Sequence, residues 1–131
     1  MKIQILEHTG DARGWLYQLQ QESHEFIGEI REMHMASIKP GSIRGNHLHL
    51  RKKEMLVMMV EDTCQLYWKL PEKLEPKIET FNKGTIVIEI EPGTAHAIYN
   101  NGQKDLIINS YSDTPYSPET DDTEPIILIK P

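Results

Sequence analysis

Short runs in which polar and apolar residues alternate constrain the fold of this chain more than any other feature. Alternation with a period of two is typical of a half-buried strand, because successive side chains point to opposite faces. KIQIL (2–6) and GTIVIEIEPG (84–93) alternate in this way, and the second run stops at a Pro-Gly turn. No stretch of ten or more residues keeps a helical period. With turn signals roughly every 8–12 residues, the sequence predicts an all-β sandwich or barrel.

Other runs between turn signals also have the composition of strands. They are GWLYQL (14–19), HEFIGEI (24–30), EMHMASI (32–38), EMLVMMV (54–60), CQLYWKL (64–70), AHAIYN (95–100), DLIINSYS (105–112) and IILIKP (126–131). Residues 71–83 carry two prolines and many charges, which predicts a hairpin at the surface. The Asn-Gly pair of NNGQ (100–103) favours a tight hairpin. The segment 112–131 is predicted to be an acidic loop followed by a last strand, and its composition fits an ordered arm and partial disorder equally.

Length, charge and cysteine content exclude several classes of protein. At 131 residues the chain has the length of one domain, and no linker or repeat divides residues 1–131. The formal net charge of −6 argues against a basic nucleic-acid-binding face. Neither a membrane span nor a leader sequence is evident, so we expect a cytoplasmic protein without a nucleic-acid or membrane partner. The single cysteine, Cys64, excludes an internal disulfide and is predicted to be a buried, unreactive residue.

A set of histidines and one glutamate predicts a metal site. His47 and His49 stand one residue apart, so in a strand both point to the same side. Glu54 can return to that side if the basic tripeptide 51–53 bends, and His96 follows the turn EPGT in a strand that could lie opposite. Three imidazoles and one carboxylate suit one divalent ion such as Zn, Fe, Mn, Ni or Co.

The other histidines, His8, His24 and His34, have no such partners in the sequence and are predicted to be ordinary surface or hydrogen-bonded residues. His34 differs in one respect, because the alternation of its strand through Ile38 allows it to face the interior of a barrel.

The segment GSIRGNHLHLRKKE (41–54) resembles the first motif of the cupin superfamily, and EPGTAHAIYN (91–100) resembles the second. The matching positions are Gly41, His47, His49 and Glu54, then Pro92, Gly93, His96 and Asn100. The chain departs from the pattern where Glu61 and Asp62 replace an expected glycine, and where the spacing from Gly84 to Pro92 is loose. The resemblance implies a small cupin barrel, a double-stranded β-helix or jelly roll, with the four predicted ligands around its metal.

A narrower likeness concerns the substrate. KPGSIRGNHLH (39–49) resembles cupin domains of polysaccharide and nucleotide-sugar biosynthesis, including the C-terminal metal-binding domain of capsular polysaccharide synthesis proteins. GDARGW (10–15) is similar to the opening of the dTDP-4-dehydrorhamnose 3,5-epimerases, and SYSDTPYSPETDDT (110–123) to the region after their last core strand. The likeness implies an epimerase or isomerase acting on a keto-sugar nucleotide.

That implied reaction assigns roles to particular side chains. The metal would stabilise the enolate oxygen, and Glu54 or a histidine that does not bind the metal would remove the proton. Tyr99 or Tyr111 would be the acid on the opposite face, although each is also typical of ordinary barrel lining. The predicted substrate-binding residues are Arg44, Asn46 and Lys52, and an arginine matches diphosphate oxygens well.

Two other functions stay open at the level of sequence. Cupins with the same ligand types also include iron or nickel dioxygenases of small molecules, and a binding module without turnover would need the same pocket. Because small cupins often pair, the resemblance also implies a homodimer, formed through an N-terminal strand within residues 1–35, which would cover an exposed sheet edge.

Overall fold

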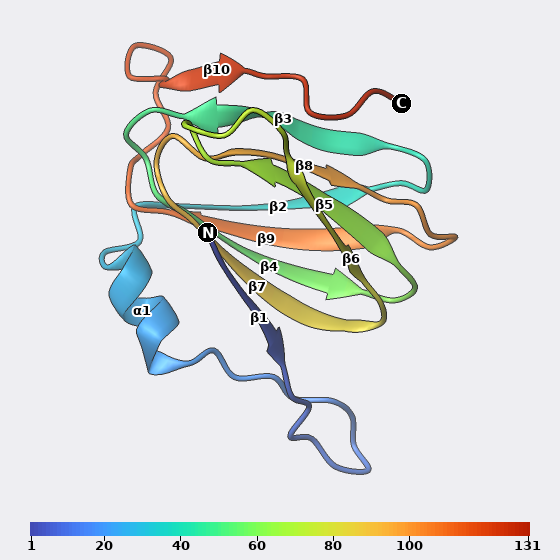
Figure 1. Ribbon diagram of the computed structural model, residues 1–131. Helices are drawn as coiled ribbons and strands as arrows, with labels where there is room; N and C mark the ends of the chain where they lie inside the picture. Colours follow the sequence, from blue (N-terminus) through green and yellow to red (C-terminus); the bar gives the residue numbers. More distant parts are fainter.

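The computed structural model describes residues 1–131 as two antiparallel sheets that face each other, with one short helix (Figure 1). The first sheet has the strand order β1-β7-β4-β9-β2 and the second has the order β10-β3-β8-β5-β6. The elements are β1 (Lys2–Leu6), α1 (Gln21–Ile27), β2 (Glu32–Ile38), β3 (Ile43–His49), β4 (Glu54–Val60), β5 (Cys64–Lys69), β6 (Lys77–Phe81), β7 (Gly84–Ile90), β8 (Ala95–Tyr99), β9 (Leu106–Ser112) and β10 (Thr123–Pro125). The predicted all-β jelly-roll barrel of the cupin type is confirmed.

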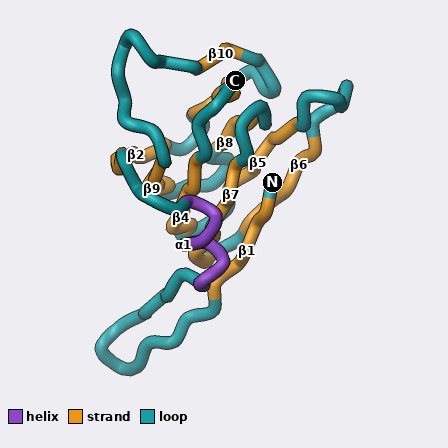
Figure 2. Tube along the Cα trace, turned by 90° about the vertical axis from the view of Figure 1, so that its left-hand side faces the viewer, coloured by secondary structure: helices purple, strands orange, loops and turns teal.

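The main core lies between the two sheets and contains 14 buried apolar residues. Strand β5 shows how the alternation builds it, because Cys64, Leu66 and Trp68 point inward while the residues between them are half-buried. Strands β4 and β7 are buried on both faces, which explains their nearly continuous apolar runs. Their outer face lies under α1, where Ile27 packs with Val57 and Val87 in a smaller cluster (Figure 2).

The predicted strands over 14–19 and 24–30 are wrong. Residues 14–19 belong to the loop that leads from β1 to the helix, and residues 21–27 form α1. The helix buries Ser23 and Ile27, which are four residues apart and therefore share one helical face. Gly28, at φ 65°, ends the helix. The apolar residues of HEFIGEI therefore lie partly in a helix, which is too short for a period of 3.6 residues to be seen in the sequence.

Two further expectations about turns and ends are corrected. NNGQ does not close a hairpin, because β8 lies in the second sheet and β9 in the first. The Asn100 side chain holds this crossing, since its Nδ2 donates to Ile38 O (2.7 Å) and to Lys104 O (2.8 Å). The last strand is β10, so the apolar run 126–131 forms no strand. The surface hairpin predicted for residues 71–83 is found in part, because these residues supply its turn and its second strand, β6, whereas its first strand is β5.

The N-terminal strand β1 pairs with β7 and forms one edge of the first sheet. The loop that follows it projects away from the two sheets (Figure 2). Pairing of two copies through this region stays a prediction. No helix of the structure has both the length and the apolar character that a membrane crossing requires.

Cys64 is fully buried in the main core, as predicted, and burial raises the pKa of its thiol to about 11. We expect the folded protein at pH 8 to react with a thiol reagent such as Ellman's reagent only at the rate of unfolding, because the reactive thiolate is scarce and enclosed. In denaturant one thiol per chain should react within minutes. Rapid stoichiometric labelling of the folded protein would contradict the buried position.

Candidate metal centre and binding pocket

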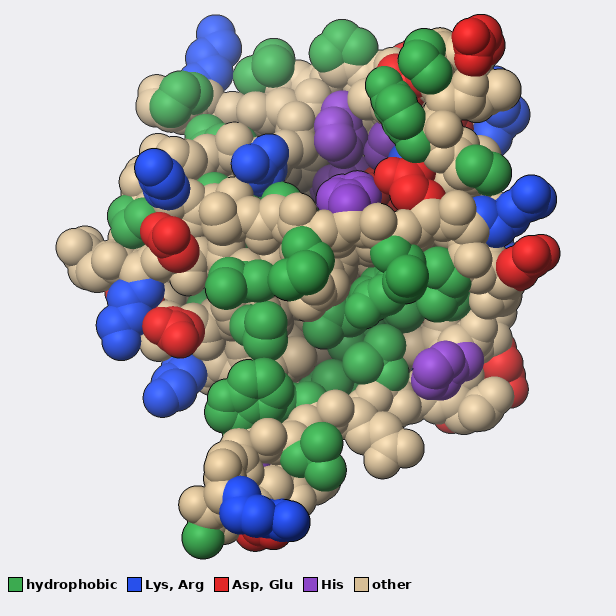
Figure 3. Space-filling model, turned by 180° about the vertical axis from the view of Figure 1, so that it is seen from behind, with side chains coloured by type: hydrophobic (Ala, Val, Ile, Leu, Met, Phe, Trp, Pro, Cys, Tyr) green, Lys and Arg blue, Asp and Glu red, His purple; other side chains and the backbone are tan.

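Three histidines and one glutamate meet at the end of the barrel where β3, β4 and β8 come together. Donor atoms of His47, His49 and Glu54 all lie within 4.8 Å of one another. His96 approaches from β8, with its Nε2 3.5 Å from Glu54 Oε1 and its ring centroid 4.9 Å from that of His47. Figure 3 shows histidine side chains gathered in a hollow of the surface. The structure therefore brings together all four of the predicted ligands.

A bulge in β3 aims the first two histidines. Gly45 pairs with Ala97 and His47 with His96, so the register shifts by one residue at Asn46. Asn46 has a φ of 57°, which is uncommon for a residue with a side chain. The shift directs His47 to the pocket beside His96, and alternation places His49 on the same face as His47.

The turn between β3 and β4 returns Glu54 to the same side. The backbone N–H groups of Arg51 and Lys52 donate to Asp122 Oδ2 at 2.7 and 3.0 Å. The N–H of Lys53 donates to Asp113 Oδ1 at 3.0 Å. Two carboxylates from the C-terminal part of the chain thus stabilise the bend at residues 51–53 that was predicted to return Glu54.

The charges of the cluster are shaped by burial and by mutual contact. Burial favours the neutral acid at Glu54, but the nearby imidazoles of His49 and His96 outweigh it and lower the pKa of this carboxyl to about 2. Burial, together with His96 and His49, lowers the pKa of His47 to about 4. Burial lowers the pKa of His96 as well. At His49 burial is outweighed by Glu54, and its pKa is raised.

One atom at the centre of the cluster has imidazole nitrogens as its neighbours. Glu54 Oε1 is buried, with His49 Nε2 at 2.9 Å and His96 Nε2 at 3.5 Å, and it accepts a hydrogen bond only when one of these nitrogens carries a hydrogen. An ionised, buried oxygen without a partner is costly unless a cation or a donor approaches it. Neutral imidazole nitrogens and a carboxylate oxygen are ligands that borderline divalent ions accept. The residues present therefore fit a divalent metal.

The predicted substrate-binding residues separate in the structure. Arg44 lines the pocket beside the cluster, and its Nε donates to Ser37 O (2.9 Å). Lys52 lies near the cluster, with its Nζ 3.9 Å from Glu32 Oε2. The prediction that Asn46 binds the substrate is wrong, because its side-chain amide is hydrogen-bonded to the C-terminal backbone. Its Nδ2 donates to Ile129 O (2.9 Å), and its Oδ1 accepts from Leu128 N (2.9 Å).

Neither tyrosine predicted as the opposing acid reaches the cluster. Tyr111 packs on the outer face of the first sheet, against the small core under α1. Tyr99 is three residues after His96 on the same strand, so alternation turns it away from the pocket that His96 and Ile98 line. The structure thus corrects the expectation that Tyr99 or Tyr111 faces the reacting carbon.

The pocket also contains polar residues outside the predicted set of site residues. It has a volume of about 720 Å³ and opens between β2 and β3. His34 and Ser110 lie in its wall, with His47, Glu54 and His96 at its inner end. His34 Nδ1 is 3.3 Å from Glu32 Oε1 on the same strand. The alternation of β2 was the available signal, since it placed His34 on the same face as Ile38.

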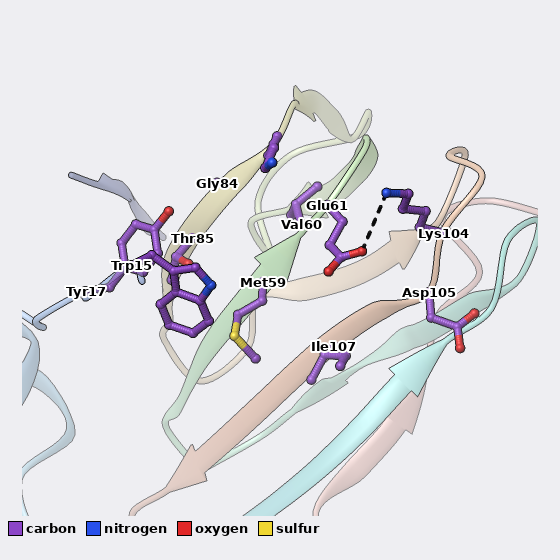
Figure 4. Close-up of a pocket in the computed structure, with 11 residues that line it drawn as sticks. Trp15, Tyr17, Met59, Val60, Glu61, Gly84, Thr85, Lys104, Asp105 and Ile107 are labelled. Carbon is purple, nitrogen blue, oxygen red and sulfur yellow. Dashed lines mark ion pairs between the residues drawn. The ribbon is translucent and has the colours of Figure 1, made fainter. Parts of the chain in front are cut away.

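A second cavity, of about 510 Å³, lies on the outer side of the first sheet (Figure 4). Trp15 and Tyr17, from the loop after β1, form one side of it next to Met59, and Ile107 lies further along the sheet. None of the predicted site residues lines this cavity. It shares no lining residue with the histidine pocket, which contains three of the four predicted metal ligands.

Comparisons with known proteins agree with this architecture. The model of one family, the polysaccharide biosynthesis C-terminal domain, matches residues 9–124. No curated protein matches the chain.

Several solved structures share the fold at low identity. A 3,4-ketoisomerase from Helicobacter canadensis is 21% identical, covers 94% of this chain and 88% of its own, and has a TM-score of 0.73. A variant of the 3,4-ketoisomerase QdtA from Thermoanaerobacterium thermosaccharolyticum, in complex with TDP-4-keto-6-deoxyglucose, is 14% identical over 94% of this chain and 85% of its own, with a TM-score of 0.71. The capsular polysaccharide assembling protein CapF from Staphylococcus aureus is 21% identical over 92% of this chain, with a TM-score of 0.67, and the match spans 34% of that protein.

Proposed function

The chain belongs to the polysaccharide biosynthesis C-terminal domain family, and from this premise we propose that it isomerises a keto-sugar nucleotide in a metal-dependent reaction. The observation that carries the proposal is the pocket, in which imidazoles and a carboxylate lie at the inner end and Arg44 lies in the wall. The likeness to 3,4-ketoisomerases supports an isomerase, and one of these structures holds a keto-sugar nucleotide.

The reaction moves a carbonyl group to the neighbouring carbon of the sugar. A proton leaves that neighbouring carbon, an enediolate forms, and a proton is added to the former carbonyl carbon. The hydroxyl proton moves to the former carbonyl oxygen, so that atoms and charge balance. The protein must therefore supply a base that takes and returns a proton, and a positive charge beside the enediolate oxygens.

His34 is the base in this proposal. A carboxylate can only accept a hydrogen bond, so the contact with Glu32 places the Nδ1 hydrogen of His34 toward Glu32 and leaves Nε2 free to take a proton. Glu32 Oε2 is buried without a hydrogen bond, and Lys52 Nζ lies 3.9 Å from it. Glu32 would thus orient His34 as a carboxylate orients the catalytic imidazole in other enzymes.

The remaining side chains bind and orient. His47, His49, His96 and Glu54 would hold the divalent ion, whose positive charge would stabilise the enediolate oxygen. Arg44, fixed by its bond to Ser37 O, offers a guanidinium to the diphosphate of the substrate. The nucleoside part of the substrate would then extend toward the open side of the pocket between β2 and β3.

Solvent exchange tests this proposal. In D₂O with TDP-4-keto-6-deoxyglucose as the probe, we expect the wild-type protein to replace the hydrogen on the carbon beside the carbonyl with deuterium, as followed by proton NMR. His34→Gln removes the base and should slow exchange by about 100-fold or more. His24→Gln is the matched control, because His24 is exposed on α1 and outside the pocket.

Each outcome separates one part of the proposal. If the wild-type protein exchanges no hydrogen in this sugar nucleotide or in other 4-keto sugar nucleotides, the isomerase function is wrong. If His34→Gln exchanges as fast as the wild type, another group is the base.

A further inference from the structure

Asp122 is a buried carboxylate that neither the predicted ligand set nor the proposed reaction uses. It lies in the segment 121–129, the C-terminal strap, which includes β10 and pairs with β3. Its Oδ1 is 3.2 Å from His49 Nδ1, and its Oδ2 accepts from the N–H groups of Arg51 and Lys52. One side chain thus touches a predicted ligand and also the turn that delivers another, Glu54.

The contact with Asp122 decides which nitrogen of His49 carries the hydrogen. An ionised carboxylate has no hydrogen to donate, so His49 Nδ1 must be the donor. The hydroxyl of Thr123 lies 3.2 Å from the same nitrogen, and its own hydrogen is directed to Asp121 Oδ1 at 2.6 Å. Both neighbours of Nδ1 are therefore acceptors. The neutral ring is left with its lone pair on Nε2, which faces Glu54 Oε1 at 2.9 Å.

A lone pair on Nε2 facing the Glu54 carboxylate is unfavourable unless a proton or a metal ion lies between the two atoms. The same arrangement is the one that a metal ion between the two atoms requires, because only the unprotonated nitrogen can coordinate. We propose that Asp122 is a positioning residue that fixes the tautomer and orientation of His49 and the bend before Glu54, so that the C-terminal strap preorganises the metal centre. This inference rests on the proposed metal site and deepens it.

The strap is itself tied to β3 at a second place. Asn46, at the bulge of β3, accepts from Leu128 N and Ile129 N through Oδ1 and donates to Ile129 O through Nδ2. The backbone O of Asn46 accepts from Ile126 N (2.8 Å). These bonds hold the strap beyond Asp122. The strap is therefore attached at the bulge that aims His47 and at the turn that returns Glu54.

The isosteric substitution Asp122→Asn separates positioning from packing. The N–H groups of Arg51 and Lys52 still need an acceptor, so the new amide must turn its oxygen toward them. Its NH₂ group then faces His49 Nδ1 and donates to it, which moves the ring hydrogen to Nε2. The fold and the turn are kept, while the nitrogen that faces Glu54 becomes protonated.

The test has one readout on metal-free protein and one on metal binding. Long-range proton–nitrogen NMR of histidine-labelled, metal-free protein, at a pH where the His49 ring is neutral, should show the Nδ1–H tautomer in the wild type and the Nε2–H tautomer in Asp122→Asn. Zinc titration should show affinity about 10- to 100-fold weaker in Asp122→Asn. Glu124→Gln, which removes one exposed negative charge from the same strap, should change neither.

The second acceptor is tested separately. Thr123→Val removes the hydroxyl near Nδ1 but leaves Asp122 in place, so the Nδ1–H tautomer should persist. If Asp122→Asn keeps both the Nδ1–H tautomer and wild-type zinc affinity, the positioning role is wrong. If the tautomer changes in Asp122→Asn but the wild-type protein binds no zinc, then Asp122 positions the ring and the proposed metal site is the part that fails.

Discussion

Replacement of any one of the three clustered histidines by alanine is expected to remove bound divalent metal. His47→Ala, His49→Ala and His96→Ala each delete one nitrogen from a set in which Glu54 supplies the only oxygen. Loss of a residue that merely orients a ligand already weakens metal binding about 10- to 100-fold, so loss of a ligand should weaken it about 100-fold or more. Each variant should then lose its metal on dialysis.

Elemental analysis of dialysed protein measures the effect, and zinc titration of the stripped protein gives the affinity. His24→Ala is the matched control, because it removes an exposed imidazole from α1. Circular dichroism distinguishes lost ligation from lost folding. Stoichiometric metal in all three cluster variants would show that the proposed metal site is wrong. Retention of metal in one variant would remove only that residue from the ligand set.

The fold was largely predictable from the sequence because burial of one face of a strand leaves a local pattern of alternating polar and apolar residues. Where one face of a strand is buried, every second residue is apolar, and β5 was found in this way. The helix was missed because α1 has seven residues, too few for the helical period to appear. The crossing at NNGQ was missed for a different reason. The Asn-Gly pair predicts a turn but does not say which sheet the next strand joins.

The histidines of the site were predictable because their geometry is mostly local. A His-x-His pair on a strand shares one face whatever the rest of the chain does. The return of Glu54 was not local, since the bend before it depends on Asp113 and Asp122, about sixty and seventy residues further along. The role of Asp122 could not be inferred from an acidic loop, because many exposed carboxylates share that composition.

The bulge in β3 accounts for both a success and a failure among the predicted binding residues. In a regular strand Arg44 and His47, three residues apart, would face opposite sides. The register shift at Asn46 brings both to the pocket. The same shift makes Asn46 an anchor for the C-terminal strap, where its amide is unavailable to a substrate. A bulge is set by contacts between strands, so alternation alone cannot reveal it.

Gly45→Ala is expected to destabilise the fold strongly, because a side chain at this position of β3 would meet the backbone of β8. A Cβ at this position would lie 2.7 Å from His96 O and 2.9 Å from Ala97 Cα. Both are backbone atoms, so the two strands would have to separate. The φ of 100° adds strain for a residue with a side chain. Together, strain and overpacking should lower the free energy of unfolding by about 2–4 kcal/mol.

The comparison that isolates the close approach is Gly41→Ala. Gly41 also has a positive φ, 79°, but a Cβ there would meet no atom within 4 Å. That variant should lose only the strain, about 1–2 kcal/mol, in urea unfolding followed by circular dichroism. Gly45→Ala should also weaken zinc binding, because separating β3 from β8 moves His47 away from its register partner His96. Equal losses of stability in the two variants, with zinc affinity unchanged in both, would show that the contact between Gly45 and the His96 backbone does not align the metal centre.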